Sequence, residues 1–318
     1  MLKTINMKNR RDFLKQAAMI SAYVSTVRLC PAMAFDADET EKMKLGLANG
    51  GEDFERIEAS DKMKLGLVTY QWGMDWDVPM LITNCEKARM SGVELRVEHA
   101  HAVTPELSAE ERKTVAKRFA DSTVTLVGFG TIFEFHSPDP NTLRKNIEGA
   151  KEYVLLAKDC GATGIKVRPN ALPAEVENEK TVAQIARSLS ELGRFASEHG
   201  QEIRLEIHGG CAPIPIIKSI IDQVPEKNVG LCWNCNPQDL LEPGLKVNFQ
   251  SVEKRLSGVI HIRELASNSY PTRELFDLLR TANYNGYLLI EEGDDKLPVE
   301  ERIRRLEQSA VTFAEWKK

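Results

Sequence analysis

The stretch from Glu202 to Gly210, EIRLEIHGG, alternates apolar and polar side chains almost without exception. Successive side chains of a β-strand point to opposite sides, so this stretch read as a strand has one apolar and one polar face. The apolar face needs a packed layer, and the polar groups are costly to bury without partners. This combination is typical of a barrel strand whose polar face points into a site. The apolar face holds Ile203, Leu205 and Ile207, and the polar face holds Arg204, Glu206 and His208.

Seven further apolar runs have the length of strands and alternate with amphipathic helical segments. Such alternation implies parallel strands joined by crossover helices, and eight units over roughly 250 residues match a (β/α)8 barrel. A doubly wound open sheet competes, but no G-x-G-x-x-G pattern follows the first strand. We therefore predict an α/β protein, a single-domain (β/α)8 TIM barrel over residues 62–318. The predicted strands span residues 64–70, 93–98, 124–130, 163–168, 202–208, 229–234, 259–263 and 286–291.

Helix boundaries between these strands carry local signals. Ser108 and Glu111 have the spacing of a capping box, in which each side chain binds the backbone N–H of the other residue. Pro140 lies where a helix is expected to begin, and Gly161 and Gly200 lie where helices are expected to end.

Residues 1–34 are predicted to be an export signal outside the fold. The run NRRDFLK at residues 9–15 is typical of a twin-arginine signal, an apolar stretch follows, and AMA at residues 32–34 matches a cleavage site. The alternative is an amphipathic helix with a chance arginine pair, favoured by Arg28 within the apolar stretch. That stretch is too short for a stable membrane span. We expect a periplasmic or otherwise exported protein in which residues 35–61 form an acidic linker.

Composition excludes several classes of partner and scaffold. The chain has 318 residues, a formal net charge of −5, 42% hydrophobic and 28% charged residues, which is ordinary for a soluble globular protein. It has no long basic run, so we expect no nucleic-acid partner. Six cysteines are too scattered for a disulfide scaffold. The pair Cys232 and Cys235 lies in an apolar run, which favours packed thiols over a redox motif.

Four predicted strands carry, late in the strand, an inward-pointing polar residue whose neighbours are apolar. In a TIM barrel, catalytic groups stand at the carboxyl ends of the strands on their inward faces. Two carboxylates, an imidazole and an amide oxygen at one mouth form a mixed site for a divalent metal such as Mn, Mg, Zn or Co. The four candidate ligands are Glu206, Asn234, His261 and Glu291.

Glu206 and Glu291 are also the candidate catalytic residues. A metal that polarises a carbonyl and an adjacent hydroxyl acidifies the C–H between them, and a carboxylate can remove or return that proton. The alternative for the whole set is a salt-bridged polar core with Lys166, Arg204 and Arg263.

Further polar residues near the strand ends are candidate substrate-binding groups. Lys166 and Arg168 share an inward face and could bind hydroxyls or a carboxylate. For Glu94 and Arg96, which also point inward, an internal ion pair is the favoured interpretation. The complete set of candidate substrate-binding residues is Lys166, Arg168, His208, His101, His136 and Arg263.

Four segments resemble the metal-binding strands of the xylose isomerase-like TIM barrel superfamily, often labelled sugar phosphate isomerase/epimerase. They are LEIHG at 205–209, VGLCWN at 229–234, VIHI at 259–262 and GYLLIE at 286–291. The resemblance covers residues 62–318. The stretches ELRVEHAH, EFHSPDP and KVRPN are further similar to an exported bacterial subgroup.

The resemblance implies roles for the four candidate ligands. In ketose epimerases and isomerases of this superfamily, Glu, Asp, His and Glu on successive strands hold a divalent metal, and the two Glu exchange a substrate proton through an enediolate. Glu206, His261 and Glu291 match by type and strand. Asn234 stands where the family usually has Asp, which removes one of three negative charges and should weaken metal binding.

The leading hypothesis is a metal-dependent isomerase or epimerase of a free sugar or keto-sugar, since an exported enzyme rarely meets sugar phosphates. A lyase or hydratase on 3-keto-glycosides would use the same acidified C–H but expel a leaving group. A non-catalytic sugar-binding barrel, whose site decayed at Asn234, is the hypothesis from another class. The superfamily's DNA-repair endonucleases are a fourth alternative. They need a richer set of His and Asp ligands and a basic groove, and neither is visible in this sequence. The expected partner is a small carbohydrate, and a homo-oligomer is left open.

Overall fold

Eight parallel strands lie side by side in the order β6-β5-β4-β3-β2-β1-β8-β7. The computed structural model describes residues 62–267, 269–293 and 296–317. Between the two edge strands, Ser257 N donates to Leu231 O at 2.8 Å and His261 N donates to Trp233 O at 2.7 Å, so the barrel is nearly closed. The strands are β1 Lys64–Val68, β2 Gly92–Arg96, β3 Thr125–Glu134, β4 Gly164–Arg168, β5 Glu202–Glu206, β6 Val229–Cys232, β7 Val259–Ile262 and β8 Tyr287–Ile290.

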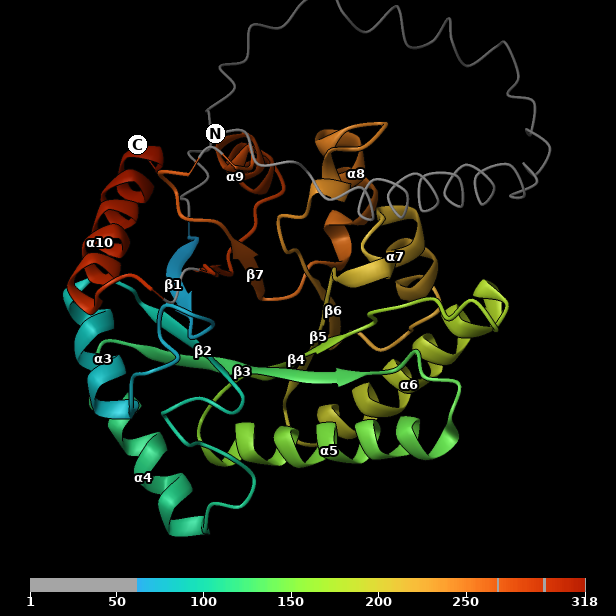
Figure 1. Cartoon of the computed structure of the whole chain (residues 1–318), viewed down its shortest axis with the longest axis horizontal. Helices are drawn as coiled ribbons and strands as arrows, with labels where there is room; N and C mark the ends of the chain where they lie inside the picture. Colours follow the sequence, from blue (N-terminus) through green and yellow to red (C-terminus); the bar gives the residue numbers. More distant parts are fainter. Residues whose placement is uncertain (1–61, 268, 294–295, 318) are drawn as a thin grey trace, which may run out of the picture. The chain divides into compact units, whose positions relative to one another are not determined.

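Helices alternate with the strands and cover the outer face of the barrel, as α5 and α6 do beside β3, β4 and β5 (Figure 1). This arrangement confirms the predicted (β/α)8 barrel. The α-helices are α3 Val78–Lys87, α4 Ala109–Ala120, α5 Pro140–Asp159, α6 Asn178–Glu198, α7 Ile214–Ile221, α8 Leu245–Val252, α9 Thr272–Thr281 and α10 Val299–Trp316. The described residues also form the short 3-10 helices η1 Gly209–Cys211, η2 Pro237–Leu240 and η3 Glu253–Arg255.

The alternation along each strand divides the core into two parts. One set of side chains packs under the helices and forms the large hydrophobic cluster, to which Ile203, Leu205 and Ile207 belong. A second, small apolar cluster is made of Val68, Val127, Cys232, Val259 and Leu289. The polar residues that alternate with the large cluster along each strand therefore point into the barrel, and the packing of that cluster holds their strands in place.

The inward face of β5 begins with a buried arginine. Arg204 is 1% exposed and donates to Glu202 Oε2 at 2.7 Å, Val127 O at 3.1 Å and Thr163 Oγ1 at 2.8 Å. A Cβ atom at Gly128 would lie 2.5 Å from its Nη1, so glycine makes room for the guanidinium. Arg204 is thus fixed in the barrel interior. Glu206 and His208 lie further along the chain, towards the carboxyl-terminal mouth of the barrel.

The local signals that bound the helices are confirmed. Ser108 and Glu111 form the capping box of α4, and Pro140 occupies the first turn of α5 after the N-cap Asp139. Gly161 and Gly200 have φ of +78° and +68°, a conformation that glycine adopts without strain.

Four predicted strands, at 64–70, 93–98, 202–208 and 229–234, end two residues earlier in the structure, and the largest difference is at β3. β3 ends at Glu134, four residues beyond the predicted end at residue 130. After a register shift, Glu134 pairs with Arg168 of β4, and Thr131 Oγ1 donates to Lys166 O at 2.6 Å. The four extra residues carry β3 past the end of β2 and as far as the last residue of β4.

The predicted export signal and linker lie outside the described residues. Within the part of the chain that the structure describes, none of the helices is both long and apolar enough to cross a membrane.

Candidate metal and catalytic site

Glu206, the last residue of β5, is held by two donors. Its Oε2 accepts from Lys166 Nζ of β4 at 2.6 Å, and its Oε1 accepts from Asn234 Nδ2 at 2.9 Å. Asn234 lies two residues beyond the end of β6, on the inward side that strand alternation predicts. All three side chains are buried, so the carboxylate is fixed by charge-assisted bonds in a site with little water.

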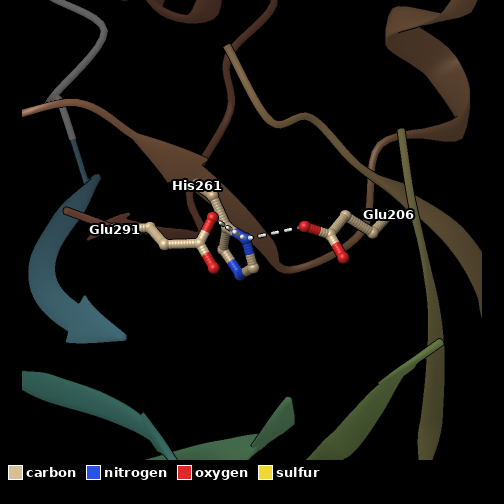
Figure 2. Close-up of side chains that lie close together, drawn as sticks. All are labelled: Glu206, His261 and Glu291. Atoms are coloured by element: carbon tan, nitrogen blue, oxygen red, sulfur yellow. Dashed lines mark ion pairs between the residues drawn. The ribbon is translucent and has the colours of Figure 1, made fainter. Parts of the chain in front are cut away.

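His261 of β7 lies between the two candidate catalytic carboxylates (Figure 2). Its Nδ1 is 3.7 Å from Glu206 Oε1 and 3.5 Å from Glu291 Oε2. Glu291 follows β8 directly, and its side chain is 13% exposed, whereas His261 is fully enclosed. The predicted convergence of strands β5, β7 and β8 on one point is therefore seen in the geometry.

The electrostatics of this group follow from its burial and its charges. Burial alone would raise the pKa of Glu206, but the Lys166 ammonium and His261 outweigh it and hold that pKa well below the ordinary value. Burial alone would lower the pKa of His261, but the acidic groups around it, among them Glu291 and Glu94, raise that pKa well above its usual range. Glu206 is thus a carboxylate, and the negative charges around His261 favour a proton on its ring.

Glu94 of β2 completes the surroundings of His261. Its Oε1 lies 3.2 Å from His261 Nε2, and its side chain is fully buried. The sequence favoured an ion pair between Glu94 and Arg96, and this interpretation was wrong. The guanidinium of Arg96 instead lies over the ring of Tyr70, 5.7 Å from its centroid. Strand alternation placed Glu94 inward, but it gave no signal for a partner on the opposite side of the barrel.

The donor set fits a divalent metal. One ligand atom from each of Glu206, His261 and Glu291 can be chosen so that all lie within 4.8 Å of one another. His261 Nδ1 is buried and has no hydrogen-bond partner among the described residues, although it faces two carboxylates. Two carboxylates and an imidazole suit Zn, Mn or Co. The amide of Asn234 donates to Glu206 here, and rotated about its last bond it would present its oxygen instead.

The candidate substrate-binding residues fall into different environments. Lys166 is 1% exposed and is paired with Glu206, so its ammonium acts on that carboxylate directly. Arg168 Nη2 lies 2.7 Å from Glu134 Oε1, and His136 Nδ1 lies 3.7 Å from Glu134 Oε2. The longer β3 therefore brings Arg168 and His136 to a shared carboxylate.

Three other candidates are held by hydrogen bonds. His208 Nδ1 is 2.8 Å from Asn170 Oδ1, and its pKa is lowered by burial although Glu206 opposes that shift. Arg263 Nη1 donates to Glu291 O at 3.1 Å. Both ring nitrogens of His101 are engaged, Nε2 with Arg96 O at 2.7 Å and Nδ1 with Val103 N at 3.0 Å. The bonds of His101 stabilise the loop after β2, and substrate contact for these residues stays a prediction.

The two cysteines near the site are buried free thiols. Cys232 lies at the end of β6 and Cys235 in the loop that follows. Burial raises the pKa of both thiols. Packed thiols, as the sequence favoured, agree with this environment.

Comparison with solved structures finds the same fold in several proteins. The 3-keto-D-glucoside 4-epimerase YcjR from E. coli has a TM-score of 0.63 at 15% identity, covering 79% of this chain and 100% of that one. The IOLI protein with a bound zinc atom has a TM-score of 0.68 at 16% identity, covering 80% and 99%. D-Psicose 3-epimerase from Clostridium cellulolyticum H10, solved with D-tagatose, has a TM-score of 0.67 at 16% identity, covering 80% and 99%.

Among curated proteins, no sequence matches this chain significantly. The family model described as xylose isomerase-like TIM barrel matches residues 82–310, which span β2 to β8 and with them all four candidate ligands. The chain therefore belongs to the xylose isomerase-like TIM barrel family.

Proposed function

We propose that this protein is a metal-dependent isomerase or epimerase of a free sugar or keto-sugar. The observation that carries the proposal is the placement of His261 between Glu206 and Glu291, with all three ligand atoms in one small group. Similarity to the D-psicose 3-epimerase and to the E. coli 3-keto-D-glucoside 4-epimerase supports the same class of reaction.

Glu206, His261 and Glu291 would hold the metal, and the zinc atom of the structurally similar IOLI protein supports a divalent ion. When bound, such an ion polarises a substrate carbonyl and its neighbouring hydroxyl, which acidifies the C–H between them. Asn234 lies close enough to Glu206 to add an amide oxygen to the set.

The two carboxylates have unequal environments that suit two steps of a proton transfer. Glu206 is held by Lys166 as a carboxylate, the unprotonated form that a base needs. Glu291 is the more exposed of the two and stands on the other side of His261. Removal of a proton by one carboxylate and its return by the other, on the opposite face of the carbon, would invert that carbon.

The basic groups around this pair suit a polyhydroxylated substrate. Arg168 and His136 lie at the ends of β4 and β3, and Arg263 and His208 follow β7 and β5. Hydroxyl and carbonyl oxygens accept from such donors, and sugar-binding sites use several of them to fix one orientation.

The test is solvent proton exchange by the purified chain supplied with Mn2+. We expect deuterium from D2O to enter free ketoses or 3-keto-sugars at a carbon beside the carbonyl. Glu206→Gln and Glu291→Gln should each abolish this exchange, whereas Glu134→Gln, which alters a carboxylate outside the metal group, should retain it at a reduced affinity. No exchange with any ketose or keto-sugar, or retained exchange in both glutamine variants, would refute the proposal. Release of an aglycone from a 3-keto-glycoside without isomerisation would replace it with a lyase.

For its location, we propose that the chain is exported through the twin-arginine route. The support is the NRRDFLK run at residues 9–15 and the AMA site at residues 32–34. Replacement of Arg10 and Arg11 by lysine should move the full-length protein from the periplasmic to the cytoplasmic fraction of a bacterial host. Equal fractionation of both forms would rule the route out.

A further inference from the structure

Glu94 is a fully buried carboxylate with no hydrogen-bond partner among the described residues. Its side chain is 0% exposed on β2, and both Oε1 and Oε2 lack such a partner. A buried charge without compensation is strongly unfavourable, so its neighbours must supply the compensation. The nearest is His261, whose Nε2 lies 3.2 Å from Oε1. Lys166 and Arg204 contribute positive charge from further away.

The two ring nitrogens of His261 have different surroundings. Nε2 lies 3.2 Å from Glu94 Oε1, whereas Nδ1 lies 3.7 and 3.5 Å from Glu206 and Glu291, and the Cys232 thiol also contacts the ring. An imidazole that binds a metal has one nitrogen free of its proton, and the proton then resides on the other nitrogen. The position of Glu94 favours the proton on Nε2, since an N–H donates to a carboxylate and a lone pair does not.

We propose that Glu94 is a positioning residue that keeps the proton of His261 on Nε2 and thereby presents Nδ1 to the metal. The role of Nδ1 as a metal ligand rests on the proposed function, whereas the position of the proton on Nε2 does not. A carboxylate that binds the far nitrogen of a metal-ligating histidine fixes the ring and raises its basicity, and its loss typically weakens metal binding about 10- to 100-fold.

The packing around Glu94 supports a fixed carboxylate. Gly130 of β3 lies beside it, and a Cβ atom there would be 2.7 Å from Glu94 Oε1 and 3.1 Å from Arg96 Cδ. The absence of a side chain at Gly130 therefore leaves the room that the carboxylate occupies. A methyl group at this position would push Glu94 away from its place without changing its charge.

The experiment measures Co2+ binding by the metal-free full chain and the NMR signal of the His261 Nε2–H proton. Glu94→Gln keeps the shape of the side chain but removes its charge, and we expect it to weaken Co2+ binding about 10- to 100-fold. Gly130→Ala should weaken binding in the same direction, because it displaces Glu94. The matched control is Asp239→Asn, a buried carboxylate that bonds Tyr270 and not His261, and it should bind Co2+ as the unaltered chain does.

In the unaltered chain, the Nε2–H proton should appear far downfield, as a proton shared with a carboxylate does, and Glu94→Gln should move it upfield. Unchanged Co2+ affinity and an unmoved signal in Glu94→Gln would overturn the inference. If the unaltered chain binds no Co2+, the proposed metal site fails. The Nε2–H signal then still decides whether Glu94 holds that proton, because it is observed without metal.

Discussion

Lys166 Nζ lies 2.6 Å from Glu206 Oε2, and both side chains are at most 3% exposed. The pair joins neighbouring strands in the barrel interior. Glu206 also accepts from Asn234, so its two oxygens are bonded before any ligand enters. The pair therefore couples the stability of the barrel to the charge state of a catalytic candidate.

Replacement of Lys166 by methionine should leave Glu206 a buried charge without its ammonium partner. We expect a loss of about 3–5 kcal/mol in the free energy of unfolding, because removal of one partner of a buried pair is strongly destabilising. Chemical denaturation measures it. The control is Lys117→Met, since the Lys117–Asp121 pair has the same 2.6 Å separation but both side chains are exposed, and its loss should change stability little. In the Lys166→Met, Glu206→Gln double variant most of the loss should be recovered, and a purely additive result would contradict this account.

Asp239 gives the fold a pH dependence of definite sign. Burial raises the pKa of this carboxyl from 3.8 to about 7, although its bond with Tyr270 opposes the shift. The folded chain then binds more protons than the unfolded chain between these values. The group therefore stabilises the fold fully below about pH 4, and this contribution is lost as the pH rises towards 7.

Asp239→Asn removes this dependence while keeping the shape of the side chain. Relative to the unaltered chain, the variant should gain thermal stability at pH 8 and gain none, or lose some, at pH 4. The measurement is the melting temperature of both proteins across this range. A constant difference between the two proteins would show that Asp239 does not titrate there.

Arg302 of α10 anchors the loop between β1 and α3 through two kinds of acceptor. It makes two bonds of 2.7 Å with Asp75 and a third, at 3.0 Å, with the carbonyl of Trp72. The guanidinium is buried, whereas the Asp75 side chain is half exposed. We expect Arg302→Met to cost about 1–3 kcal/mol, because it leaves a buried carbonyl without a donor. Asp75→Asn should cost less than about 1 kcal/mol. Equal costs in urea denaturation would mean that the ion pair alone matters.

The eight strands and the inward position of the candidate metal ligands could be predicted from the sequence. The two-residue period of a strand can be recognised from adjacent residues alone. In Val259–Ile262 the isoleucines on either side of His261 show that its side chain points inward. Because parallel strands place their carboxyl ends at one mouth, Glu206, His261 and Glu291 follow from period and order alone.

Contacts across the barrel and between strand ends could not be predicted in this way. Period assigns Glu94 to the inward face, but the choice of His261 as its partner depends on how the barrel closes. The length of β3 depends on a register shift against β4, which no local pattern marks. The hydrogen bonds of both His101 ring nitrogens likewise depend on the path of the loop after β2.

Asn234→Asp tests the expectation that an amide at this position weakens metal binding. The amide now donates to Glu206 Oε1 at 2.9 Å, and a carboxylate at that place would face Glu206 with like charge. We expect the metal-free variant to be less stable than the unaltered chain, because two buried carboxylates repel at this distance.

The same substitution adds a third carboxylate to the donor set, so Mn2+ or Zn2+ should bind more tightly and restore the lost stability. Calorimetric titration and melting temperatures with and without metal measure both effects. Asp239→Asn serves as the control, because this buried carboxyl bonds Tyr270 and Asn236 and none of the candidate ligands. A variant that loses stability without gaining metal affinity would show that Asn234 does not face the metal.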